Sequence, residues 1–77
     1  MKRTSKDRAA LPEYAARLIE ARERIGLSRP QLAAKAGISF KTIAAWEMGI
    51  RMPQAYVPLS AIAKALNVTV EWILRGN

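Results

Sequence analysis

The feature that most constrains this fold is a glycine turn between two short helical segments near the middle of the chain. Residues 28–31 read Ser-Arg-Pro-Gln, a capping box in which the serine begins a helix and the glutamine bonds back to it. Gly37 can end that helix, because glycine readily adopts the left-handed backbone conformation that turns a chain sharply. Ser39 can cap a second helix, and Gly49 can end it. The pattern therefore predicts two short helices joined by a tight turn, the second running from about Ser39 to Met48.

Three other segments carry apolar residues at helical spacing. They lie at about residues 12–25, at residues 58–66, and in a short stretch that Thr69 can cap. No segment alternates apolar and polar residues over the length of a strand. A chain of 77 residues is long enough for one small domain. We therefore predict an all-α fold of five helices over residues 11–77, preceded by a flexible basic arm over residues 1–10.

The second helix of the central pair is expected to present one face to solvent. Ala33 is small, so this helix can cross close to the first, and Ile43 and Trp46 lie three residues apart and should face inward. A protruding helix of this kind is the shape that a DNA major groove accepts. The outer face that remains consists of Phe40, Lys41, Ala44, Ala45 and Met48.

Composition argues against catalysis. The chain has no cysteine and no histidine, which removes thiol chemistry, the commonest general base and the commonest transition-metal ligand. Its six acidic residues match no calcium-loop spacing. We therefore expect no enzyme activity, no metal and no cofactor.

Charge points instead to a polyanionic partner. The formal net charge is +7, and residues 1–8 and 27–53 each hold four basic residues against one acidic residue. No stretch near 20 apolar residues could span a bilayer, and the apolar stripes are too narrow to favour a membrane surface. We expect a cytoplasmic protein whose partner is double-stranded DNA.

The chain resembles the Cro and phage-repressor type of helix-turn-helix family, also called Xre-like. The resemblance covers roughly residues 12–76 and implies a lambda-repressor-like fold. Its matching positions are Gly26-Leu27-Ser28, Leu32-Ala33, Gly37-Ile38-Ser39, Ile43, Trp46-Glu47-Met48-Gly49, Arg51, Pro53, Ile62-Ala63-Lys64-Ala65-Leu66, Val68 and Trp72-Ile73-Leu74.

This resemblance implies which residues contact DNA bases. In the family, residues that open the third helix of the domain touch base edges. Lys41 can donate to guanine O6 and N7, whereas Phe40 and alanine methyl groups can pack on thymine methyl groups. The face lacks the Gln, Asn and Arg residues that often dominate such helices, so specificity can also depend on DNA shape and on the arm. The base-contacting residues implied are Phe40, Lys41, Thr42, Ala44 and Ala45.

Contacts to the DNA backbone and a structural ion pair follow from the same resemblance. The basic charge of the arm leaves two alternatives for Lys2, Arg3 and Lys6, namely a solvated tail or a tail that wraps into an adjacent groove. Arg22 and Glu47 are expected to form a salt bridge that locks the first helix to the third. Trp46 is foremost a core residue whose indole N–H can also reach a phosphate. The backbone-contacting residues implied are Arg29, Gln31, Ser39, Trp46 and Arg51.

The sequence thus predicts a transcription regulator that binds operator DNA, most simply a Cro- or repressor-like protein acting as a homodimer. Trp72, Ile73 and Leu74 can serve either the core or the dimer contact. One alternative is an antitoxin whose main partner is a toxin protein and whose DNA binding serves autoregulation. Another is a pure protein-interaction module, which would bind DNA only weakly and without sequence preference. The segment from Pro53 to Leu59 is about one residue longer than is usual in the family.

Overall fold

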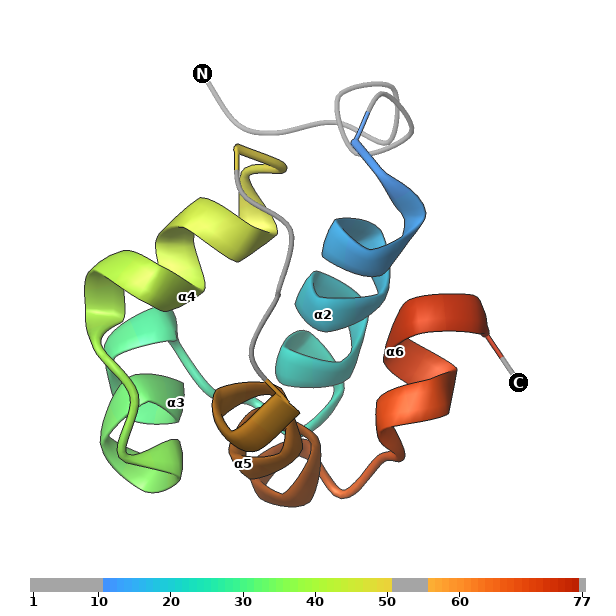
Figure 1. Ribbon diagram of the computed structural model, residues 1–77. Coiled ribbons are helices and arrows are strands. Elements are labelled where there is room, and N and C mark those ends of the chain that lie inside the picture. The colour runs from blue at the N-terminus through green and yellow to red at the C-terminus, as the bar shows by residue number, and fades with distance from the viewer. Residues whose placement is uncertain (1–10, 51–55, 77) are drawn as a thin grey trace.

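The computed structural model describes residues 11–50 and 56–76, and these residues form helices with short connections (Figure 1). The described part of the chain contains five helices and no strand, which confirms the predicted fold class. The helices are α2 (Glu13–Arg24), α3 (Arg29–Ala36), α4 (Phe40–Glu47), α5 (Tyr56–Leu66) and α6 (Val70–Arg75).

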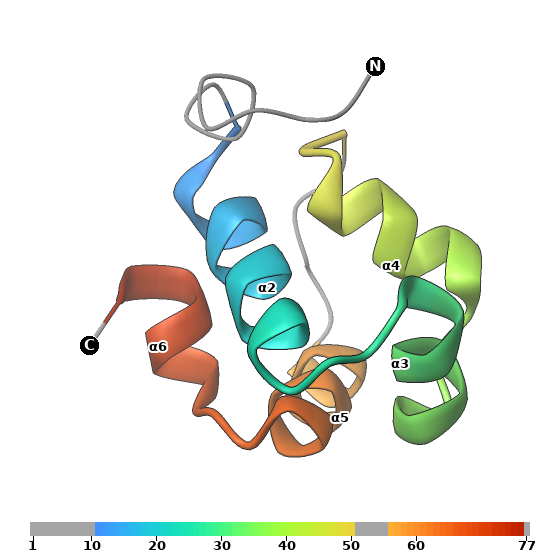
Figure 2. The same ribbon diagram turned by 180° about the vertical axis from the view of Figure 1, so that it is seen from behind.

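Helix α2 forms the centre of the arrangement. It packs against α4 on one side and against α6 on the other, and Figures 1 and 2 show these two helices on opposite flanks of α2. Helix α3 packs against α4 and α5, and α5 in turn contacts α6. Helix α4 therefore lies at the edge of the domain, with α2 and α3 behind it.

The turn between α3 and α4 has the geometry that the capping signals predict. The Ser28 hydroxyl accepts a hydrogen bond from the Gln31 backbone N–H, and the Gln31 side chain accepts one from the Ser28 N–H. Gly37 has a φ of 71°, in the left-handed region, and its N–H donates to the Ala33 carbonyl. Ser39 then caps α4 by accepting from the Lys41 N–H. Together, these bonds satisfy backbone groups that the ends of two short helices would otherwise leave unpaired.

Two helix boundaries differ from the prediction, and both involve proline. Pro12, expected in the first turn, is the N-cap of α2, where its carbonyl accepts from the Ala15 and Ala16 N–H groups. Helix α5 begins at Tyr56, earlier than the predicted start at residue 58. Pro58 thus sits inside the first turn, where backbone N–H groups have no partner within the helix, so its missing N–H costs no bond.

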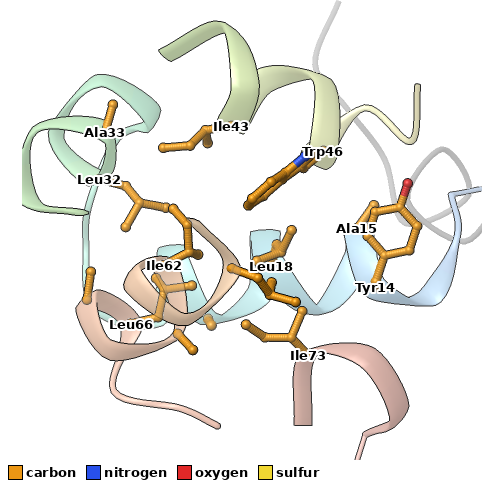
Figure 3. Close-up of a cluster of buried hydrophobic side chains, with 14 residues drawn as sticks. Tyr14, Ala15, Leu18, Leu32, Ala33, Ile43, Trp46, Ile62, Leu66 and Ile73 are labelled. Carbon is orange, nitrogen blue, oxygen red and sulfur yellow. The ribbon is translucent and has the colours of Figure 1, made fainter. Parts of the chain in front are cut away.

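The core fills the space enclosed by the helices. Figure 3 shows Leu18, Ile43, Trp46, Ile62 and Ile73, which come from four different helices, pointing toward one another. Ala15 and Ala21 on α2 are also buried, and small side chains at such positions let helices approach closely. Because the core includes Ile73, a dimer surface cannot use that side chain; Trp72 and Leu74 are only partly buried.

Two glycines with positive φ provide a matched test of this packing. A Cβ added at Gly37 would meet no atom within 4 Å, whereas one at Gly49 would lie 2.7 Å from Pro12 Cδ. We expect Gly37→Ala to lower the free energy of unfolding by about 1–2 kcal/mol, the usual cost of a left-handed conformation with a side chain. Gly49→Ala should cost more, because Pro12 must also move. Urea unfolding measures both variants, and equal losses would contradict the contact between Pro12 and Gly49.

Candidate nucleic-acid interface

The exposed face of α4 consists of the residues that helical spacing predicts. Lys41 is exposed, and Phe40 and Met48 have relative exposures of 47% and 46%. Thr42, Ala44 and Ala45 are partly buried on the same helix. The opposite face consists of Ile43, Trp46 and Glu47, all of them buried. The structure therefore brings the five predicted base-contacting residues together on one short helix at the edge of the domain.

Ser39 and Gln31, two of the predicted DNA-backbone contacts, first serve the helix ends. The Ser39 hydroxyl oxygen accepts from the Lys41 N–H at 3.1 Å, and Gln31 Oε1 accepts from the Ser28 N–H at 2.8 Å. Both side chains are exposed. The groups left to bind a phosphate oxygen are the Ser39 hydroxyl proton and the Gln31 amide nitrogen, both of which are donors.

Glu47 joins three helices through one buried carboxylate. It is the last residue of α4, with a relative exposure of 0%. Arg22 on α2 donates from Nε to Oε2 at 2.8 Å and from Nη2 to Oε1 at 3.0 Å, the paired geometry in which a guanidinium binds a carboxylate most strongly. Arg29, the first residue of α3, donates from Nε to Oε1 at 2.9 Å. The predicted Arg22–Glu47 salt bridge is therefore present, and Arg29 is a third member.

Arg22 and Arg29 differ in how many of their side-chain nitrogens have a hydrogen-bond partner. Arg22 also donates from Nη1 to the Leu27 carbonyl, so each of its three nitrogens has a partner. Arg29 bonds through Nε alone among the described residues, and its side chain is 25% exposed. The two guanidinium groups share one carboxylate, so one positive charge is not neutralised. This excess positive charge lies at the start of α3, where the helix dipole also favours anions. This arrangement suits Arg29 to holding a phosphate with its two terminal nitrogens.

Trp46 lies in the core rather than on the surface. Only 4% of the residue is exposed, and its ring packs toward Leu18 in Figure 3. The side chain fills the space between α4 and α2, as expected of an inward position beside Ile43. A contact between Trp46 and the DNA backbone would be confined to the indole N–H.

Four of the predicted contacts lie outside the described residues. They are Arg51 in the segment after α4, and Lys2, Arg3 and Lys6 in the arm. Within the described ranges, no group of three or more acidic, histidine or cysteine side chains could hold a metal ion. None of the helices described has the length and apolar character that crossing a membrane requires.

Sequence reasoning missed the bond between Arg29 and Glu47. These residues are 18 positions apart, and they meet only because α3 and α4 cross where one begins and the other ends. Spacing within either helix carries no signal for such a contact. Sequence reasoning also missed the exposure of Ile50, which lies just after the Gly49 turn with a relative exposure of 72%.

Comparison with known proteins gives a family match and a structural match. A family model described as helix-turn-helix matches residues 18–73. A chain in the solved structure of a SinR protein/SinI protein complex superimposes with a TM-score of 0.77 at 24% sequence identity. The match covers 80% of this chain and 60% of that one, so this chain spans about three fifths of its neighbour's length. A structural likeness at this level of sequence identity supports the fold alone. A search of curated proteins found no match to the sequence.

The cluster of Glu47 with Arg22 and Arg29 predicts that two charge-neutralising substitutions differ greatly in their effect on stability. We expect Glu47→Gln to lower the free energy of unfolding by about 3 kcal/mol or more, because Arg22 and Arg29 would lose their shared counter-charge in a buried position. Glu20→Gln, which affects an exposed pair with Arg24 on α2, should cost less than about 1 kcal/mol. Thermal or urea unfolding compares the two variants. Similar losses would mean that Glu47 does not hold the helices together.

Proposed function

The chain belongs to a helix-turn-helix family of DNA-binding transcription regulators, and on that basis we propose that it is a cytoplasmic Cro- or repressor-like protein that binds operator DNA. The observation that carries the proposal is the outer face of α4, which is exposed at the edge of the domain in a chain with a net charge of +7. A helix so placed can enter a major groove without disturbing the core. The base contacts in this proposal come from Phe40, Lys41, Thr42, Ala44 and Ala45.

Phosphate contacts in the proposal surround this face. Arg29 is held by Glu47 and offers its terminal nitrogens, and Ser39 and Gln31 offer one donor group each. Such contacts set the orientation of the protein on the duplex and carry no sequence information. Further backbone contacts are assigned to the indole N–H of Trp46 and to Arg51, and the arm residues Lys2, Arg3 and Lys6 are assigned to a neighbouring groove.

The proposed binding form is a homodimer on a two-fold operator. Its half-sites would then lie roughly 34 Å apart, one helical turn of DNA. Sedimentation of the protein alone and with operator DNA measures the stoichiometry. A single protomer on the complete site would contradict the dimer without contradicting DNA binding.

A second candidate function includes a protein partner, as in an antitoxin that binds a toxin and regulates its own synthesis. The observation that favours it is that the SinR protein, which has a similar fold, occurs in a complex with the SinI protein. Co-purification of a second small protein at fixed stoichiometry with the chain expressed in its own host distinguishes this function from that of a simple repressor. Purification of the chain alone, in a form that binds its operator fully, favours the repressor.

Selection of bound duplexes from a random DNA pool tests the proposed function directly. We expect enrichment of a defined sequence, and we expect Lys41→Ala to change that sequence at one position, because Lys41 is the exposed donor on the base-reading face. Lys35→Ala on α3 removes the same side chain away from that face and should leave the sequence unchanged. A pool that shows no enrichment with the unmodified protein would contradict sequence-specific binding.

The phosphate contact proposed for Arg29 predicts that its loss changes the salt dependence of DNA binding. Arg29→Gln should weaken binding to all sequences alike and reduce the slope of log K against log salt by about 0.9, the value for one phosphate contact. Glu47 would keep its two bonds to Arg22, so the fold should persist. Arg75→Gln on α6, a helix on the far side of α2 from α4, is the matched control. An unchanged slope for Arg29→Gln would mean that Arg29 binds no phosphate.

A further inference from the structure

We infer that the outer face of α4 recognises the C5-methyl group of pyrimidines, and that it accepts 5-methylcytosine in place of thymine. The inference rests on the proposed function and specifies the chemical group that the proposed site reads. It makes the protein sensitive to cytosine methylation within its binding site. Three observations on α4 and its immediate neighbours lead to it.

The first observation is a row of apolar side chains along the exposed face. Phe40, Ala44 and Met48 are each four residues apart, a spacing that places them one above another on a helix. Phe40 and Met48 remain about half exposed, and Ala45 lies beside the row. Of the four large apolar residues that are exposed in the described part of the chain, three (Phe40, Met48 and Ile50) belong to α4 or the turn after it. Such clustering marks a binding surface.

The second observation is that α4 offers almost no hydrogen-bond acceptor to a base. The major groove presents amino groups on adenine and cytosine, and only an acceptor can recognise them. The Glu47 carboxylate is buried and bonded to two arginines, and the Ser39 oxygen, which precedes the helix, uses one of its two lone pairs to accept from the Lys41 N–H. Thr42 is partly buried. A base that faces the apolar row is thus read by its shape and its methyl group, not by its amino group.

The third observation is the charge beside the row. Lys41 is exposed one position after Phe40, and its ammonium group is a donor that suits guanine O6 and N7. The Arg29 guanidinium lies where α3 begins and carries the charge that Glu47 does not neutralise. An apolar face bordered by cations fits a polyanion that bears methyl groups better than it fits the apolar surface of a protein. Duplex DNA that places a methylated pyrimidine near a guanine has this chemistry.

The distinction between thymine and 5-methylcytosine follows from these observations. The two bases carry the same methyl group at the same ring position and differ at C4, where one has a carbonyl and the other an amino group. Where neither an acceptor nor the Lys41 ammonium group faces C4, the contact with Phe40, Ala44 or Met48 is the same for both. Unmethylated cytosine and uracil both lack the methyl group, so each should lose that contact.

Matched duplexes test this inference. The binding sequence obtained by selection is prepared with thymine at the position facing α4, and then with uracil, cytosine or 5-methylcytosine there, each with its complementary base. We expect uracil and cytosine to weaken binding about fourfold for each methyl group removed, and 5-methylcytosine to restore most of the affinity lost with cytosine. Fluorescence anisotropy titrations at one salt concentration give the ratios.

Protein variants assign the effect to the apolar row. Of Phe40→Ala and Met48→Ala, the variant whose side chain contacts the methyl group should bring the affinity ratio of the thymine duplex to the uracil duplex close to one. Ile25→Ala removes a similarly exposed apolar side chain at the end of α2 and should leave the ratio unchanged. Because these side chains lie outside the core, all three variants are expected to fold, and unfolding curves check this.

The outcomes separate this inference from the proposed function. Equal affinity for the thymine and uracil duplexes, with specific binding retained, would overturn methyl recognition and leave the DNA-binding function intact. High affinity for the thymine duplex but not for the 5-methylcytosine duplex would overturn the equivalence of the two bases. Failure of the selection to enrich any duplex would contradict the proposed function itself, and methyl recognition would then be contradicted as well.

Discussion

The buried carboxylate of Glu47 determines how α4 is held. Glu47 ends α4, Arg22 reaches it from the middle of the domain, and Arg29 reaches it from the start of α3. A charge removed from water is costly unless it is paired and hydrogen-bonded, and here both carboxylate oxygens accept bonds from guanidinium groups. Displacing any of the three helices would break a charged bond, so the position of the exposed face depends on an interaction made behind it.

This arrangement separates the functions of the two sides of α4. Ile43 and Trp46 fill the core, and Glu47 joins the ionic cluster, so these positions are committed to the fold. The outer positions contribute little to that packing and are free to suit a binding partner. Membership of the helix-turn-helix family supports DNA binding, and the outer face of α4 is largely apolar.

Local signals in the sequence predicted most of the fold, because capping and periodicity act over a few residues. Ser28, Gly37 and Ser39 marked the ends of α3 and α4 correctly, and the resemblance to a known family supplied the Arg22–Glu47 pair. What escaped prediction depends on how helices cross. The bond from Arg29 to Glu47 is one example, and the early start of α5 at Tyr56 is a smaller one, since proline can stand at more than one place in a first turn.

The contact between Gly49 and the start of α2 has a consequence for the geometry of the chain. Pro12 and Leu11 lie so close to Gly49 that a side chain there would collide with the proline ring. The polypeptide therefore enters the folded domain beside the C-terminal end of α4. Gly49 thus ties the end of α4 to the residues that open α2, although the two segments lie far apart in sequence.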